Sequence, residues 1–352
     1  MNHASLPSPG ISPAAEMPAA ATVSAVALAP AAEWFPDFPQ TWYLLGPARQ
    51  LRERPQSFGM FGRRLVAFRG QGGVPALIDA ECAHMGNYMD RGRVVDGCIE
   101  CPFHGWRYDG SGQCAKIPAQ AEIPAATRRR AFPVAERHGL LFAHFGSRPR
   151  FDVPQFFQPS DVQLVPGRPV RYTMGSPWWV FAANGFDMQH FALVHDRQVI
   201  GEPQVDSPDP FGRRIQLDFR VTGKSLADRF IRTFLGDRAH VSITVWGGNL
   251  VGVTARFPRT VSRLLFASHP DGRQRTQATL VVFAERGSRY TRWMVPLSLW
   301  VRRLLTTAFV RDDTNRVTRA IYRPESLIAA DRVMIDYYRW LAALCSTEES
   351  ES

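Results

Sequence analysis

Two pairs of metal-ligating residues stand close together in the first third of the chain. Cys82 and His84 form the first pair, and Cys101 and His104 follow after a gap of sixteen residues. Two thiolates on one iron and two imidazoles on the other can hold a 2Fe-2S cluster, and the imidazoles raise its reduction potential above that of an all-cysteine cluster. The same ligand types also make structural zinc sites. The spacing therefore predicts either a one-electron relay or a zinc site.

A second group of candidate ligands follows about a hundred residues later. Asp187 and His190 are three residues apart on a helix predicted to run from Trp178 through His195, so they share a face. His195 lies five residues beyond His190 and reaches the same metal only if the helix ends or distorts between them. Two imidazoles and one carboxylate form the facial triad of non-haem Fe(II) oxygenases, with positions open for oxygen and substrate. The alternative is two unrelated histidines on an apolar stretch.

The carboxylate of such a triad must come from another part of the chain. Asp312 and Asp313 are the candidates, and both lie on a helix predicted over residues 297–321. The residue pattern does not decide which of the two is the ligand, because either acid can equally be a solvated or capping group.

The elements that would position these ligands fall into two domains, and the expected fold class is α+β. Short β-runs separated by Gly, Pro and Asp fill residues 38–148 and predict an all-β domain with both Cys–His loops at one end. A proline-containing linker over 149–170 follows. Residues 171–345 predict an antiparallel sheet with flanking helices. We expect a disordered Ala/Pro-rich leader over 1–33 and an acidic tail over 346–352.

Composition and charge limit the choice of partners and compartment. The 352 residues carry a net charge of +10, but the arginines are scattered without a recognition motif, which argues against nucleic acid as a partner. Five cysteines, two of them candidate ligands, favour the reducing cytoplasm over a disulfide framework. The leader has no Lys or Arg ahead of its apolar stretch, unlike a signal peptide. No run of about 18 apolar residues predicts a membrane-spanning helix.

The second domain is rich in large apolar side chains. Candidates to line a cavity, or to pack individually in the core, are Trp178, Trp179, Phe181, Phe186, Phe191, Phe234, Trp246 and Trp293. No cluster of Arg or Lys stands near the histidines, which disfavours small aromatic acids as substrates. The apolar segment 293–305 contains paired arginines. It predicts either contact with a membrane surface or the helix that presents Asp312.

Longer motifs surround the candidate ligands. They are Cys82-Ala83-His84-Met85-Gly86, Cys101-Pro102-Phe103-His104-Gly105-Trp106-Arg107, Cys114 with Ile117-Pro118, Asp187-Met188-Gln189-His190 with His195, and Arg339-Trp340. Together they resemble the α-subunits of Rieske non-haem iron oxygenases over residues 38–344. Within that family the chain is similar to the oxygenase component of 3-ketosteroid 9α-hydroxylases and to cholesterol 7-desaturases.

This resemblance implies two metal centres and a catalytic domain of the helix-grip type. The implied ligands are Cys82, His84, Cys101 and His104 for a 2Fe-2S cluster, and His190, His195 and Asp312 for a mononuclear Fe(II). We choose Asp312 over Asp313 because the count back from Arg339-Trp340 crosses less sequence than the count forward from the histidines.

The resemblance also implies a reaction and partners. Electrons from NAD(P)H would arrive through a separate ferredoxin or flavin reductase, because the chain has no G-x-G-x-x-G fingerprint. A head-to-tail homotrimer would let the catalytic residue Asp187 link His104 of one subunit to His190 of the next. The expected reaction uses O2 to hydroxylate, demethylate or desaturate a sterol or steroid. The alternative substrate is an aromatic or natural-product scaffold.

Overall fold

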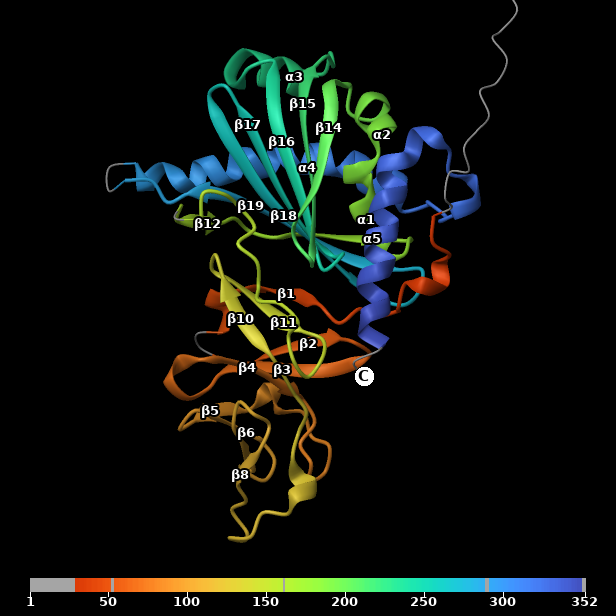
Figure 1. Ribbon diagram of the computed structural model, residues 1–352. Coiled ribbons are helices and arrows are strands. Elements are labelled where there is room, and N and C mark those ends of the chain that lie inside the picture. Colours follow the sequence, from red (N-terminus) through yellow and green to blue (C-terminus); the bar gives the residue numbers. More distant parts are fainter. Residues whose placement is uncertain (1–28, 52–53, 161, 289–290, 350–352) are drawn as a thin grey trace, which may run out of the picture.

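The computed structural model describes residues 29–51, 54–160, 162–288 and 291–349, which form two domains stacked end to end (Figure 1). An all-β domain precedes a domain made of one large antiparallel sheet and several helices. This architecture confirms the predicted α+β class. No described helix is long and apolar enough to cross a bilayer.

Most of the predicted leader lies outside the described residues, and its described end is ordered. Ala29 is buried, residues Ala32–Trp34 form a 3-10 helix, and the ring of Phe35 stacks on that of Trp179 with centroids 4.9 Å apart. The end of the expected leader contacts the second domain, since the Tyr322 hydroxyl donates to the carbonyl of Pro30 at 2.7 Å. The apolar Phe35 just after it packs in the same domain.

Three antiparallel sheets make up the first domain. The first has the order β1-β11-β10, at Trp42–Pro47, Leu140–His144 and Val134–Arg137. The second has the order β2-β3-β4-β9, at Gln56–Met60, Arg63–Arg69, Pro75–Asp79 and Ala131–Phe132. The third has the order β5-β6-β7-β8, at Arg93–Val95, Cys98–Glu100, Arg107–Tyr108 and Cys114–Lys116. It forms the end of the molecule farthest from the large sheet (Figure 1).

One of the predicted β-runs forms a hairpin over residues 93–100. Strands β5 and β6 pair through Val95 and Cys98. Asp96 and Gly97 form the turn with φ values of 52° and 75°. Asp-Gly is a preferred sequence for such left-handed hairpin turns, so the sequence did carry the signal.

The second domain is built on an eight-stranded antiparallel sheet. Its order is β12-β19-β18-β17-β16-β15-β14, at Leu164–Pro166, Thr276–Glu285, Thr260–Pro270, Leu250–Phe257, Arg238–Trp246, Gly212–Val221 and Arg197–Asp209; β13 (Val170–Met174) also pairs with β19. Strand β12 falls within the segment expected to be a linker, so that segment contributes to the sheet.

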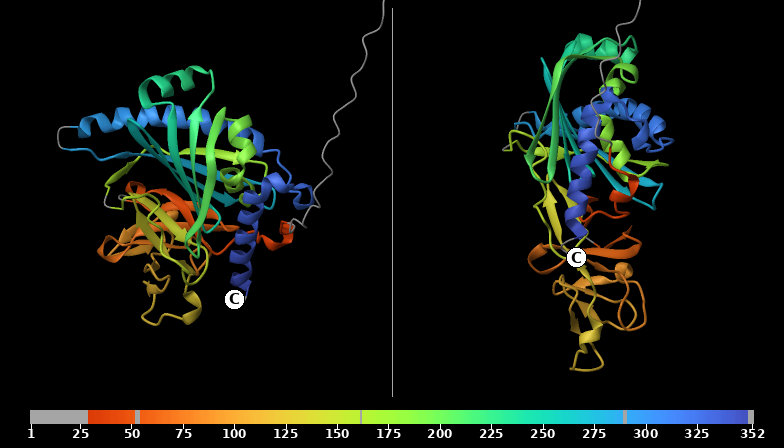
Figure 2. Two further views of the ribbon diagram at one scale, coloured as in Figure 1. Left: turned by 45° about the horizontal axis from the view of Figure 1, so that its top comes forward. Right: turned by 45° about the vertical axis from the view of Figure 1, so that its right-hand side comes forward.

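Five α-helices accompany the sheet among the described residues. They are α1 (Trp178–Ala183), α2 (Met188–Leu193), α3 (Leu226–Phe230), α4 (Val295–Val317) and α5 (Arg332–Glu349). Figure 2 shows the long helix α4 lying across one face of the sheet. Helix α5 continues through residues 346–349, which we expected to begin an acidic tail.

The helix predicted from Trp178 through His195 is interrupted. Helix α1 ends in a 3-10 turn over Asn184–Phe186, and Asp187 has extended φ and ψ values of −92° and 103° before α2 begins. Helix α2 then ends at Leu193, two residues before His195. The structure therefore meets the condition under which both histidines can face one metal.

Candidate metal centres

The four predicted ligands of the first centre meet at the end of the first domain. Cys82 and Cys101 are each 3% exposed, whereas His84 and His104 face solvent. The Nδ1 atoms of the two histidines are 3.1 Å apart. Two imidazole nitrogens bound at about 2.1 Å to one tetrahedral metal lie about 3.4 Å apart. The two rings are therefore already turned toward a common point.

The two ligand loops share one backbone design. The amide of Gly86 donates to the carbonyl of Cys82 at 2.9 Å, and the amide of Gly105 donates to that of Cys101 at 3.1 Å. Both glycines have φ near 70°, with values of 71° and 70°. A left-handed residue four positions after each cysteine closes the loop, and glycine adopts that conformation without strain.

A buried hydroxyl supports the first centre. The Tyr108 hydroxyl accepts a hydrogen bond from the amide of Ala83 at 3.1 Å and lies 3.3 Å from Sγ of Cys82. Because the amide can only donate, the hydroxyl proton is free to point at the sulfur. Burial, and then the contact with Cys82, raise the pKa of Tyr108. Trp106 stacks on His84 with ring centroids 4.9 Å apart.

The second centre brings together α2, the segment that follows it and α4. The Nε2 atoms of His190 and His195 are 3.0 Å apart. Oδ1 of Asp313 lies 3.0 Å from the first and 2.7 Å from the second. These three residues are the one group of this kind found among the described residues, with ligand atoms within 4.8 Å of one another. Two imidazoles and a carboxylate are a donor set that suits Fe(II).

The structure corrects our choice of Asp312 as the carboxylate. Asp313 is 7% exposed and touches both histidines, whereas the neighbouring Asp312 is exposed to solvent. Successive helical residues point about 100° apart, so only one of the pair can face the histidines. The count from Arg339-Trp340 crossed the irregular segment 318–331, whose length the sequence pattern does not fix.

Asp187 is the N-cap of α2. Its Oδ1 accepts hydrogen bonds from the amides of Gln189 at 3.0 Å and His190 at 3.1 Å. Among the described residues, no hydrogen bond is formed by its Oδ2. Because the cap fixes the first turn of α2, it also fixes the direction from which His190 enters the site.

His195 is held from two sides. Its ring stacks on Phe309 of α4, with ring centroids 3.7 Å apart and planes 11° apart. Its carbonyl accepts a hydrogen bond from Arg197 at 2.7 Å. The following residue, Asp196, has a φ of 51°, a left-handed turn that lets the chain leave the site as strand β14.

An ion pair that sequence reasoning missed lies behind His195. Arg197 is 5% exposed and forms a 2.9 Å ion pair with Asp228, which is 6% exposed. Asp228 also accepts a hydrogen bond from the hydroxyl of Ser225, and the two make a capping box at the start of α3. The Ser-x-x-Asp spacing predicts that box. No local sequence pattern predicts that Asp228 pairs with Arg197 on β14.

We expect Asp228→Asn to destabilise the protein by roughly 3–5 kcal/mol at neutral pH, because it leaves Arg197 buried without its counter-ion. Urea unfolding measures this. Asp206→Asn is the matched control, since Asp206 pairs with Arg214 at the surface and such pairs contribute about 0–1 kcal/mol. Equal losses in the two variants would contradict the role of the buried pair.

The same pair predicts a pH dependence. Burial tends to raise the pKa of Asp228, but the hydrogen bond from Ser225 and the charge of Arg197 outweigh it and hold that pKa below its ordinary value. A carboxyl whose folded-state pKa is lowered stabilises the fold above its unfolded pKa of about 3.9 and loses that contribution as the pH falls through the folded value. The stability gap between wild type and Asp228→Asn should therefore narrow below about pH 4.

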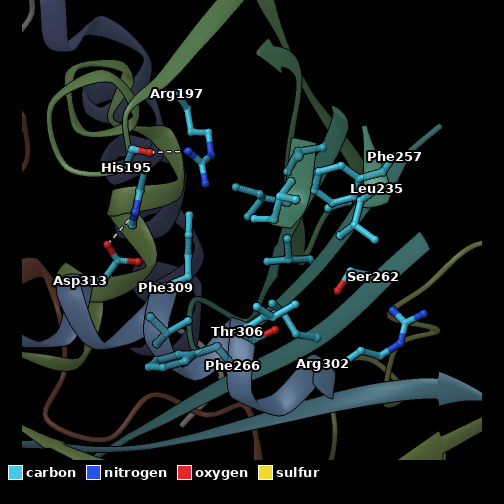
Figure 3. Close-up of a pocket in the computed structure, with 18 of the residues that line it drawn as sticks. His195, Arg197, Leu235, Phe257, Ser262, Phe266, Arg302, Thr306, Phe309 and Asp313 are labelled. Atoms are coloured by element: carbon cyan, nitrogen blue, oxygen red, sulfur yellow. Dashed lines mark hydrogen bonds and ion pairs between the residues drawn. The ribbon is translucent and has the colours of Figure 1, made fainter. Parts of the chain in front are cut away.

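A cavity of about 490 Å³ opens beside the second centre. His190, His195 and Asp313 form part of its wall, and most of the remaining lining is aliphatic or aromatic (Figure 3). Phe181 and Phe191 line it, as predicted for two of the eight aromatic candidates. The aromatic liners that sequence reasoning did not select are Phe219, Phe230, Phe257, Phe266 and Phe309.

The family model described as "Rieske [2Fe-2S] domain" matches residues 41–127, a range that contains all four ligands of the first centre. The first domain is a Rieske domain. This match decides between the two chemistries that the spacing left open, in favour of the 2Fe-2S cluster. The buried sulfurs of Cys82 and Cys101 and the outward-facing histidines fit such a cluster.

Curated relatives match this chain over less than half of its length. Aminopyrrolnitrin oxygenase PrnD of Pseudomonas fluorescens is 33% identical in an alignment of 165 residues that covers 44% of this chain and 45% of the relative. Cholesterol 7-desaturase nvd 1 of Ciona intestinalis is 30% identical, over 46% and 35%. A 3-ketosteroid-9-alpha-monooxygenase oxygenase component of Rhodococcus rhodochrous is 30% identical, over 45% and 43%. The chain thus spans less than half the length of each relative.

Solved structures resemble nearly the whole chain. Dicamba monooxygenase bound to dicamba aligns with a TM-score of 0.67 and 19% identity, covering 89% of this chain and 98% of that one. NdmA of Pseudomonas putida CBB5 with caffeine aligns with a TM-score of 0.66 and 19% identity, covering 88% and 92%. The Rieske domain and the large-sheet domain therefore share the fold of these proteins.

The hydroxyl beside Cys82 predicts a measurable effect on the Rieske domain. A hydrogen bond to a cluster ligand stabilises the reduced, more negative state and raises the potential. We expect Tyr108→Phe to lower the midpoint potential by on the order of 50 mV, close to a tenfold change in a one-electron equilibrium. A redox titration followed by electron paramagnetic resonance measures it. An unchanged potential in a variant with full cluster content would show that the hydroxyl does not act on the sulfur.

Proposed function

We propose that this chain is the oxygenase component of a Rieske-type monooxygenase that oxidises a sterol- or steroid-like molecule. One observation carries the proposal: a two-histidine, one-carboxylate site stands at one end of an apolar cavity, in a chain that also contains a Rieske domain. Neither a simple electron carrier nor a structural zinc protein needs the second centre or the cavity.

The residues of the second centre would hold a mononuclear Fe(II). Held by His190, His195 and Asp313, an Fe(II) would supply activation of O2, and its electrons would come from NAD(P)H through a separate ferredoxin or flavin reductase and the 2Fe-2S cluster. The chain's own contribution is positional. The stack of Phe309 and the hydrogen bond from Arg197 hold His195, and the apolar wall keeps water from the side where the substrate lies.

The walls of the cavity support a large apolar substrate. The charge of Arg197 in the wall is neutralised by Asp228, so the described residues at the metal end offer no free cation for a small aromatic acid. Two of the relatives are named for 3-ketosteroids and cholesterol. Hydroxylation, demethylation or desaturation of a sterol or steroid is therefore the first candidate reaction. The names of dicamba monooxygenase and aminopyrrolnitrin oxygenase favour the second candidate, an aromatic or natural-product substrate.

The positions of the two centres support a head-to-tail homotrimer. The third sheet of the Rieske domain and helix α2 lie at opposite ends of the molecule (Figure 1). Apolar side chains are exposed at both ends: Met85 and Phe103 are 66% and 57% exposed beside the cluster ligands, and Leu193 is 80% exposed at the end of α2. Contact between one end and the other of the next subunit would cover these residues and bring His104 close to Asp187 of its neighbour.

The start of α4 and the 3-10 turn before it (Arg292–Met294) support contact of a cytoplasmic enzyme with a membrane surface. Trp293, Leu297 and Trp300 are 72%, 57% and 61% exposed, and Leu297 also lines the cavity. An apolar substrate could thus leave the bilayer and enter the cavity along one helix face. Sedimentation with anionic vesicles should carry down the wild-type protein and less of Trp300→Glu. Equal sedimentation of both would exclude this face.

The test of function is product analysis. The anaerobically purified and reconstituted protein is incubated with a surrogate reductase, NADH, O2 and a mixture of sterols that includes 4-methylated and 3-keto compounds. We expect a new oxygenated, desaturated or demethylated sterol by gas chromatography–mass spectrometry. No sterol product from enzyme with about three irons per chain, two of them in a reducible cluster, would transfer the proposal to aromatic or natural-product substrates.

A further inference from the structure

We propose that Arg302, with the hydroxyls beside it, forms a recognition site for a carboxylate in the part of the cavity away from the metal ligands. The enzyme would then select an elongated apolar molecule that carries an anionic group far from the carbon that is oxidised. This inference rests on the proposed function for the identity of the reacting end, and on the contacts of Arg302 for the rest.

One face of α4 runs the length of the cavity. Its lining residues recur every three or four positions from Leu297 to Asp313, and they include Ser298, Arg302, Thr306 and Phe309. Arg302 and Asp313 are eleven residues apart on this face, which at 1.5 Å per residue is about 16 Å. In Figure 3, Arg302 lies on the far side of the cavity from His195 and Asp313.

Strand β18 also lines the cavity, with hydroxyl residues in one part and apolar residues in the other. Thr260, Ser262, Leu264 and Phe266 line it in alternation, as residues on one face of a strand do. The two hydroxyl residues come first, near Arg302, and the apolar pair follows. Ser298 and Arg302 of α4 thus lie together with the hydroxyl residues of β18, away from the metal ligands, where they could solvate a polar group of the substrate.

Arg302 is partly buried, and every partner found for it is neutral. Its Nε donates to Ser298 at 3.1 Å, its Nη1 to the carbonyl of Val261 at 2.7 Å and its Nη2 to Thr260 at 3.1 Å. No ion pair of Arg302 occurs among the described residues, and the nearby Glu285 is bound by Arg263 at 2.8 Å. These contacts orient the guanidinium and leave two of its five N–H groups available.

A carboxylate is the group that such a site favours. A guanidinium only donates hydrogen bonds, so the ligand must present acceptor oxygens, and a carboxylate presents two in matching geometry. Burial and the charge of Arg263 lower the pKa of Arg302 by more than the charge of Glu285 raises it, as expected for a cation that no carboxylate contacts directly. Short acids cannot reach both Arg302 and the metal ligands, which lie about 16 Å apart along α4.

The test compares two steroids with one skeleton, a 3-keto steroid with a five-carbon side-chain carboxylic acid and its methyl ester. Binding to the reduced, metal-replete enzyme is measured by isothermal titration calorimetry without O2, so no turnover is needed. We expect wild type to bind the acid about tenfold or more tightly than the ester. Arg302→Gln should abolish this preference, and Arg302→Lys should keep part of it.

Arg303→Gln is the matched control, because it removes the same charge from the same helical turn at a position outside the cavity lining. It should keep the wild-type preference. Equal affinity of wild type for acid and ester, or loss of the preference in Arg303→Gln as well, would overturn the carboxylate site. The proposed function is judged separately by oxidation of either steroid when reductase and O2 are added. If the steroids are oxidised but the acid is not preferred, only the carboxylate site is wrong. If neither steroid is oxidised and the acid is not preferred, both proposals are wrong.

Discussion

Asp313→Asn should yield a protein that keeps its 2Fe-2S cluster, loses the mononuclear iron and forms no product. The amide cannot replace the anionic oxygen that meets His190 and His195 at 3.0 and 2.7 Å. A metal contributes several kcal/mol to its reaction, and each 1.4 kcal/mol is tenfold, so turnover should fall by about a thousandfold or more. Iron analysis should fall from about three to about two atoms per chain, with the cluster spectrum unchanged.

The neighbouring acid supplies the control for this experiment. Asp312→Asn removes the same charge one residue earlier on α4, from a side chain that is exposed to solvent. It should retain its iron content and nearly all of its activity. If Asp312→Asn loses the mononuclear iron and Asp313→Asn keeps it, the assignment of the carboxylate made here is wrong.

Asp187→Asn should separate metal binding from electron transfer. Asn is as good an N-cap as Asp, so α2 should remain intact and His190 should stay in place. The asparagine carries no charge and cannot accept hydrogen bonds from two imidazoles as a carboxylate can, and the loss of such an outer partner costs about 10–100-fold or more. We expect about three irons per chain, a reducible cluster and turnover near the limit of detection.

The decisive readout is the rate at which the reduced cluster is reoxidised when substrate and O2 are added. In Asp187→Asn this reoxidation rate should fall by about the same factor as the turnover rate. Asp331→Asn serves as the control, since Asp331 accepts a hydrogen bond from Gln189 of the same helix at 2.9 Å without lying in the proposed path. Substantial activity in a metal-replete Asp187→Asn protein would exclude the bridge between subunits.

The first centre could be predicted from the sequence because its information is local. Each Cys–His loop carries its own ligands and the glycine that closes it, so Cys82 with Gly86 and Cys101 with Gly105 define the geometry within five residues. The hairpin turn at Asp96-Gly97 is equally local, because this dipeptide by itself favours the left-handed turn.

The second centre could be predicted only in part because it depends on contacts across the fold. The sequence indicated that His190 and His195 need a helix end between them, but the spacing of Asp187 and His190 was interpreted as one helical face instead of a cap. The choice between Asp312 and Asp313 depends on the rotation of α4 against the sheet. That rotation is set by packing of residues such as Phe309 and Val310, which no local pattern specifies.

Helix α4 presents the candidate ligand Asp313 and the cation of Arg302 on one continuous face. If both act as proposed, their separation along the helix sets the length of substrate that fits. Each helical turn along this face changes that separation by about 5.4 Å. Exchange of Ser298 and Arg302 would move the cation about one helical turn farther from the candidate metal ligands and would leave Asp313 unchanged. Related enzymes could therefore change which carbon is oxidised, or how long a substrate they accept, by substitutions on a single helix face, without altering the chemistry at its other end.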